Sequence, residues 1–79
     1  MTYAAGWNMP GYMPEMEPAE FDTPEEARDF ICWELAYMRD QQWSEETAED
    51  YQRAMDLVDT GTTSVYVGNL VYWVEPAYG

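Results

Sequence analysis

The side chains of this 79-residue sequence that can carry chemistry are almost all carboxylates. Sixteen Asp and Glu stand against three arginines, with no lysine, no histidine and one cysteine, Cys32. Without histidine there is no Ser-His-Asp or Cys-His arrangement, and neither lysine nor histidine is present to lower the pKa of the Cys32 thiol. Paired carboxylates can act as acid and base, as in glycoside hydrolysis, but no pair stands apart from the many acids here. We therefore expect that the protein is not an enzyme.

The spacing of the acids does not indicate metal or phosphate chemistry either. Carboxylate oxygens suit Ca²⁺, but the D-x-[DN]-x-[DN]-G loop of an EF-hand is absent from the sequence. No phosphate-binding loop and no dinucleotide-binding glycine pattern occurs. We expect no catalytic residue, no metal ligand and no cofactor.

The net charge of −13 at pH 7 is the outstanding global feature. It exceeds the magnitude of roughly 2–8 that keeps a small domain soluble, and self-repulsion of this size destabilises a compact chain. Solubility alone is therefore a poor explanation. The same charge disfavours direct binding to nucleic acid and to an anionic membrane surface. A basic protein surface is the partner that this charge favours.

The acids must be positioned by elements that a chain of this length, one domain over residues 1–79, can form. Residues 1–18 hold Pro10, Pro14 and Pro18 at four-residue spacing, which prevents a helix. We expect an extended N-terminal strap over the core, with a disordered leader as the alternative. Its "TYAAGW" segment, or the "PAEF" that follows, can alternatively add a third strand to a sheet.

A first helix is predicted over residues 23–41. Thr23 is a suitable N-cap, Pro24 suits the first helical position, and Glu26 completes a capping box. At 100° per residue, one face of this helix is an apolar stripe that consists of Ala27, Ile31, Leu35 and Met38. Glu34 lies beside this stripe, either as a rim residue or as a buried acid.

A second helix is predicted over residues 44–59, with Ser44 as N-cap and Gly61 as its C-terminal stop. Arg53 is placed to pair with Glu49 at i,i+4. The apolar positions Ala48, Tyr51, Ala54, Met55 and Val58 share one face of this helix.

The strongest strand signal is "TTSVYVGNLVYWVEP", which predicts a β-hairpin over residues 63–75. Gly68 and Asn69 suit a two-residue turn, and Pro76 is expected to end the second strand. One face of the hairpin would carry Val65, Val67, Leu70, Tyr72 and Val74. The expected fold class is α+β, with two helices packed on a small antiparallel sheet.

The acids of the second helix have the linear charge density of a nucleic-acid strand. Six carboxylates between Glu45 and Asp59 span roughly 21 Å, or about one per 3.5 Å, against about 3.4 Å in one strand of B-DNA. A solvated helix face is the simpler explanation of a charge run, but such a face usually intersperses both signs. We therefore predict that carboxylates bind a basic partner. The candidates are Glu25, Asp29, Glu45, Glu46, Glu49, Asp50 and Asp56.

In size, charge and acid-lined helices such as "SEETAEDYQRAMD", the sequence resembles small acidic proteins of bacteriophages and mobile elements, the anti-CRISPR and anti-restriction DNA mimics. The region "GWNMPGYMPEMEPAEFDTPEEA" also resembles the start of small phage proteins with a W-x-x-P-G-x-x-P core. The resemblance implies a stoichiometric inhibitor that binds a basic surface of a CRISPR-Cas effector subunit or nuclease in the host bacterial cytoplasm and blocks target DNA. It assigns no role to individual residues.

Two other functions fit the same sequence. One is a phage adaptor or regulatory module that binds its partner through an aromatic groove, with the acids only keeping it soluble. Exposed aromatic side chains such as Trp33, Tyr37 or Tyr66 belong instead to the predicted inhibitor, where they would supply the desolvated anchor that charge alone rarely provides. The other is an antitoxin-like inhibitor of a different basic nuclease. The sequence leaves open whether the protein is a monomer or a homodimer. It contains no apolar run long enough to span a membrane and no secretory signal, and its single cysteine fits a reducing cytosol.

Overall fold

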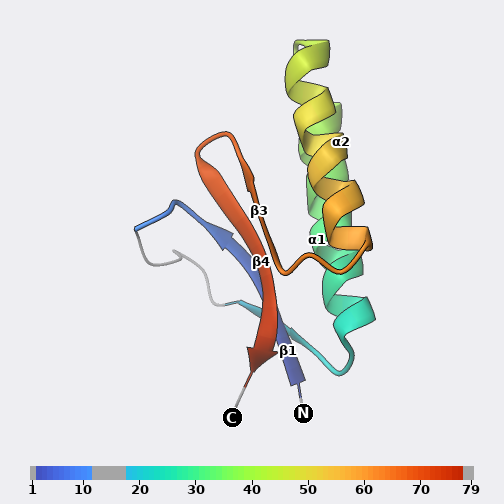
Figure 1. The fold of residues 1–79 in the computed structure, drawn as a ribbon, viewed down its shortest axis with the longest axis vertical. Coiled ribbons are helices and arrows are strands. Elements are labelled where there is room, and N and C mark those ends of the chain that lie inside the picture. Colours follow the sequence, from blue (N-terminus) through green and yellow to red (C-terminus); the bar gives the residue numbers. More distant parts are fainter. Residues whose placement is uncertain (1, 12–17, 78–79) are drawn as a thin grey trace.

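A four-stranded antiparallel sheet forms one layer of the computed structural model, and two helices form the other (Figure 1). The structure describes residues 2–11 and 18–77. The strand order across the sheet is β2-β1-β4-β3. This confirms the α+β class, the two helices and the C-terminal hairpin. The elements in chain order are β1 (Thr2–Asn8), β2 (Ala19–Phe21), α1 (Pro24–Asp40), α2 (Glu45–Asp59), β3 (Ser64–Val67) and β4 (Leu70–Ala77).

The first part of the expected N-terminal strap is an inner strand of the sheet. β1 pairs with β2 on one side and with β4 on the other, so that Ala4 lies between Glu20 and Glu75. Both segments offered as a possible third strand are therefore in the sheet. Backbone pairing explains this, because β4 pairs with β1 along its whole length and β2 pairs with it from Tyr3 to Ala5. The part of the predicted strap over residues 12–17 lies outside the described residues.

Helix α1 begins and packs as its sequence predicts. The Glu26 N–H donates to Thr23 Oγ1 at 3.2 Å, and the Thr23 hydroxyl donates to Glu26 Oε1 at 3.1 Å. Phe30 joins the helix to the sheet side, with its ring 5.3 Å from Phe21 and 6.0 Å from Trp7 between centroids. The apolar stripe forms the centre of the core, with Ala27, Ile31 and Leu35 fully buried.

Helix α2 is bounded by a side-chain cap and a glycine turn. The Thr47 N–H donates to Ser44 Oγ at 3.2 Å. At the other end Thr62 N–H donates to Leu57 O at 2.9 Å and Gly61 N–H to Val58 O at 3.0 Å. This is the Schellman pattern, and Gly61 supplies its positive φ of 105°. The helix buries Tyr51, Ala54 and Val58.

Two local predictions about this half of the chain are wrong. Arg53 pairs with Asp50 at 3.1 Å rather than with Glu49, because i,i+3 neighbours lie as close as i,i+4 neighbours on a helix. Strand β4 also does not end before Pro76, which lies opposite Tyr3 in β1. Pairing with the long strand β1 carries β4 past the missing N–H of proline to Ala77.

The hairpin register and its inward face are as predicted. Val67 pairs with Leu70, and Gly68 has φ +60° while no described non-glycine residue has positive φ, which is the pattern of a type II′ turn. The inward face is buried at Val65, Val67, Tyr72 and Val74. Burial, with the nearby Tyr51 hydroxyl and Glu34 carboxylate, raises the pKa of Tyr72 to about 12. Glu34 itself is half-buried, at the rim of the core.

Candidate functional site

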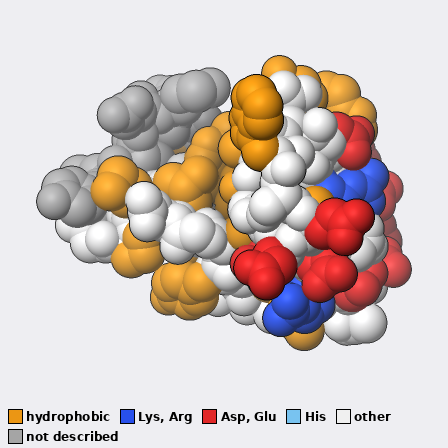
Figure 2. Space-filling view, turned by 90° about the horizontal axis from the view of Figure 1, so that it is seen from above, with side chains coloured by type: hydrophobic (Ala, Val, Ile, Leu, Met, Phe, Trp, Pro, Cys, Tyr) orange, Lys and Arg blue, Asp and Glu red, His pale blue; other side chains and the backbone are white. Residues whose placement is uncertain are grey.

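The carboxylates of the described residues are concentrated on the helical layer. Five lie on α1 and six on α2, and only Glu20, Asp22 and Glu75 lie elsewhere in residues 2–11 and 18–77. All of the helical acids except Glu34 are exposed. Figure 2 shows them gathered over the helices, whereas the sheet side of that view is mainly apolar and uncharged. Within residues 2–11 and 18–77, the helical layer therefore carries most of the negative charge.

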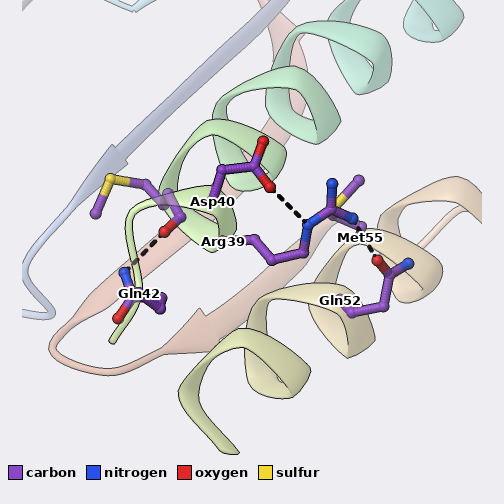
Figure 3. Close-up of polar contacts among 6 residues, drawn as sticks. Arg39, Asp40, Gln42, Gln52 and Met55 are labelled. Atoms are coloured by element: carbon purple, nitrogen blue, oxygen red, sulfur yellow. Dashed lines mark hydrogen bonds and ion pairs between the residues drawn. The ribbon is translucent and has the colours of Figure 1, made fainter. Parts of the chain in front are cut away.

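The two helices meet along a line of contacts between partly buried residues. The Cys32 thiol of α1 lies 3.7 Å from the Met55 carbonyl oxygen of α2 and donates to it. Two turns after Cys32 on α1, the Arg39 guanidinium reaches across to α2. There it donates to Gln52 Oε1 and lies 3.9 Å from Met55 Sδ (Figure 3). These contacts fix which helical positions flank the junction.

Seven carboxylates flank this junction, and we call them the acidic face. At 100° per residue they lie beside the positions of Cys32, Arg39, Gln52 and Met55 and away from the buried stripes. Because the helices are antiparallel, acids from the start of α1 lie beside acids from the end of α2. The members of the acidic face are Glu25, Asp29, Asp40, Glu45, Glu49, Asp56 and Asp59.

The electrostatics at Cys32 support this placement. Burial raises the pKa of the Cys32 thiol, and the negative charges of Asp59, Asp29 and Asp56 raise it further, while Arg28 acts in the opposite direction. Carboxylates from both helices are thus close enough to a single sulfur atom to act on it. The thiol is protonated at neutral pH and is a poor nucleophile.

The structure brings together five of the seven predicted partner-binding residues and separates two. Glu25, Asp29, Glu45, Glu49 and Asp56 are on the acidic face. Glu46 and Asp50 are on the other flank of α2, where Asp50 borders a hollow beside strand β3.

Asp40 and Asp59 were not among the predicted site residues, although they are members of the acidic face. Helical spacing alone already puts Asp40 on one face with Glu25 and Asp29, and Asp59 on one face with Glu45, Glu49 and Asp56.

Each arginine is already paired with a carboxylate on its own helix, at N···O distances of 3.1–3.5 Å. These exposed pairs contribute little stability, but they reduce the charge that their carboxylates offer to a partner. The pairs are Arg28–Glu25, Arg39–Asp40 and Arg53–Asp50. No arginine pairs with the other members of the acidic face within the described part of the chain, namely Asp29, Glu45, Glu49, Asp56 and Asp59.

The acids at the end of α2 oppose the helix dipole. The last turn of α1 contains Arg39, a favourable cation, but the last turn of α2 contains no basic residue. Asp56 and Asp59 are instead near its C-terminus, where the partial charge is negative. They are also close to Asp29 across the junction. This end of the acidic face therefore destabilises the fold that carries it.

Several large apolar side chains are exposed as well. Trp33, Tyr37 and Tyr66, which the sequence offered as anchors, are all more than half exposed. The sequence did not single out Trp43, which is fully exposed in the link that joins α1 to α2, or Leu57, an exposed residue on α2. Leu57 is adjacent to the apolar face of its helix. It becomes a candidate contact residue only because β3 lies nearby, so that both border the same hollow.

The described residues form no group of three or more acids and thiols that could hold a metal ion. None of the helices within residues 2–11 and 18–77 is both long and apolar enough to cross a membrane. Comparisons of the chain with protein-family models, with curated protein sequences and with solved structures give no match.

Proposed function

We propose that the protein is an inhibitor that uses its acidic face to occupy a basic, nucleic-acid-binding surface of another protein. The sequence resemblance suggests the target: a CRISPR-Cas effector, which would make this an anti-CRISPR protein that blocks target DNA by charge mimicry. The proposal requires no bound metal, no cofactor and no catalytic residue, and it excludes direct contact between this protein and nucleic acid.

The charge density of the acidic face supports mimicry of a polynucleotide. Its seven carboxylates span about 22 Å of helix axis, or about one per 3 Å; the five that no arginine of the described residues pairs with correspond to about one per 4 Å. One strand of B-DNA has about one charge per 3.4 Å. The charge density of the acidic face depends on acids from both helices, because two of the six acids on α2, Glu46 and Asp50, lie on the other flank of that helix. Helices hold these charges on a rigid frame, which lowers the entropy that binding would cost.

The observation that carries the proposal is the acidic end of α2, where Asp56 and Asp59 oppose the helix dipole without a nearby basic residue in the last turn. A solvated helix face serves the fold equally well with lysine at these positions. Acids that destabilise their own helix are expected where another function requires negative charge.

The test is competition with target DNA. A purified effector loaded with guide RNA is mixed with labelled target DNA and increasing amounts of the protein, and DNA binding is measured by fluorescence anisotropy. We expect stoichiometric inhibition that weakens steeply between about 50 and about 500 mM salt, since exposed charges are screened over this range. Inhibition that is independent of salt would contradict charge mimicry.

Two double variants separate local charge from total charge. Glu49→Lys with Asp56→Lys reverses the acidic face, and Glu20→Lys with Glu75→Lys reverses two exposed acids that flank Ala4 on the outer side of the sheet. Both change the net charge by the same amount. We expect the first to abolish inhibition and the second to retain it. Equal effects would mean that only the overall charge matters and would reject the acidic face as the binding surface.

Effectors from several defence systems serve as targets in the same assay, together with any basic nuclease recovered from a bacterial lysate on the immobilised protein. Recovery of a nuclease outside CRISPR-Cas, with the same salt and variant behaviour, would retain the mechanism and change the target.

A further inference from the structure

The two edges of the sheet differ in how well they are protected. β2 has only three residues, carries Glu20 and directly follows Pro18. Short length, charge and proline are features that block the addition of another strand. β3, the opposite edge, has the sequence Ser-Val-Tyr-Val, with no charge and no proline. It therefore offers an open edge that can pair with an added strand.

The register of the hairpin shows which backbone groups point outward at this edge. Val74 N–H donates to Thr63 O at 2.9 Å, and pairing continues through Val65 opposite Tyr72. In an antiparallel ladder, hydrogen-bonded pairs alternate with non-bonded ones. Ser64 and Tyr66 therefore direct their N–H and C=O groups away from β4. Each can exchange two hydrogen bonds with a further strand.

A hollow of about 360 Å³ lies beside this edge, between α2 and β3. Its wall on α2 includes Leu57, which is 51% exposed, and its wall on β3 includes Tyr66, which is 72% exposed. Buried Val65 and Val67 border it as well. An added strand would direct alternate side chains toward this hollow, where they would cover exposed apolar surface.

The charge beside the hollow is negative on balance. Asp50 and Arg53 both line it and pair at 3.1 Å, and Glu46, which pairs with no arginine among the described residues, lies one turn before Asp50 on the same flank of α2. The three side chains sum to one negative charge, in the field of a chain with net charge −13. A cationic strand is attracted to this edge, and an anionic strand is repelled.

We propose that the open edge of β3 binds an extended segment of a partner protein, in which apolar and basic residues alternate, as a fifth strand of the sheet. The apolar side chains would fill the hollow between Leu57 and Val65, and the basic ones would be oriented by the field of the protein. This surface is separate from the acidic face, so the inference goes beyond the proposed function.

A second copy of the chain is a poorer occupant of the same edge. Pairing of two β3 strands would bring together two chains that each carry a net charge of −13. It would also place Glu46 and Asp50 of one chain near the same residues of the other. Repulsion between like charges therefore opposes this pairing, although it favours a basic strand.

The test uses a synthetic peptide of about ten residues in which valine and lysine alternate, at about 0.15 M salt. Binding is measured by fluorescence anisotropy, and its location by amide NMR shifts and hydrogen exchange of the full-length protein. We expect saturable binding, with protection of the Ser64 and Tyr66 amides. Methylating alternate backbone nitrogens of the peptide, which removes its donors to β3, should weaken binding at least about tenfold.

Two variants of the protein test the same surface. Ser64→Pro removes one outward N–H at the first position of an edge strand, where proline is tolerated, and should weaken peptide binding at least about fivefold. Leu57→Lys changes an exposed wall of the hollow and should also weaken binding, even if Ser64→Pro does not fold. Trp33→Lys is the matched control, because it makes the same change at an exposed apolar residue on α1, and it should bind the peptide like the unmodified protein.

Three results would overturn the inference. They are shifts confined to the acidic face, binding that is insensitive to N-methylation, and a dimer at about 0.15 M salt that Ser64→Pro abolishes. The Glu49→Lys, Asp56→Lys protein should retain peptide protection at Ser64 and Tyr66 even though it fails to inhibit. Failure of the proposed function is therefore visible separately from failure of this inference.

Discussion

Replacing Asp59 by lysine should stabilise the protein, although Asp59 belongs to the proposed binding surface. Asp59 is the last residue of α2 and is exposed. Its charge opposes the negative end of the helix dipole and adds to the charges of Asp29 and Asp56 near Cys32. Glu45→Lys is the matched control, because Glu45 is an exposed acid at the first position of the same helix. Both variants change the net charge from −13 to −13 + 2 = −11.

The difference between these two variants isolates the local effect. A charge near a helix end contributes about 0.3–1 kcal/mol. Reversing it therefore raises the free energy of unfolding by about 0.6–2 kcal/mol in Asp59→Lys and lowers it by a similar amount in Glu45→Lys. Relief of the overall repulsion is similar for both and largely cancels. The variants should differ by at least about 1 kcal/mol, or about 4–8 °C in Tm for a domain of this size.

The assay is urea and thermal unfolding followed by circular dichroism in low salt, repeated at about 1 M salt, where the Debye length is about 3 Å. We expect Asp59→Lys to be the most stable of the three proteins in low salt, and we expect the difference to shrink in high salt. If Glu45→Lys were as stable as Asp59→Lys, the acids at the end of α2 would not destabilise the fold. The principal support for the proposed function would then be lost.

Three further predictions concern single residues. Gly61→Ala should lower the free energy of unfolding by about 1–2 kcal/mol in urea denaturation, because φ of +105° strains a residue with a Cβ. The Cys32 thiol should react with iodoacetamide more slowly at pH 8 than the thiol of a model peptide, because burial and nearby acids raise its pKa. Asp59→Asn should speed this reaction. An unchanged rate would show that Asp59 does not act on Cys32. The protein should lose stability as the pH rises from about 10 to about 12, because the pKa of Tyr72 is raised to about 12 in the folded state and the unfolded chain releases this proton first; Tyr72→Phe should reduce that loss in pH-dependent denaturation.

The parts of the fold that the sequence predicts are those determined by local interactions. Thr23 and Ser44 cap their helices through their own hydroxyls, and Gly61 ends α2 through its own backbone conformation. The Gly68 turn sets the register of the hairpin because the loop length leaves one pairing. In each case the determining contacts lie within a few residues of one another. A single sequence contains that information.

The position of β1 and the surroundings of Asp50 depend on tertiary contacts instead. Nothing local distinguishes a strap from an inner strand over Thr2–Asn8, because the strand is defined by its partners β2 and β4. Helical spacing alone puts Glu46 and Asp50 at the flank of the other acids of α2, but only the packing of β3 against α2 decides that Asp50 borders a hollow. The same packing makes the exposed Leu57 a wall of that hollow.

The acidic face and the β3 edge are linked through one property, the excess of negative charge. An uncharged open edge with exposed Tyr66 and Leu57 would ordinarily promote pairing between copies. Here the net charge opposes such pairing, so the edge can stay open without proline or lysine to protect it. The same field attracts a cationic protein to both surfaces. A basic partner that contacts the acidic face through folded arginines and lysines and the β3 edge through an extended segment would bind more tightly than through either surface alone, because the second contact is intramolecular once the first has formed.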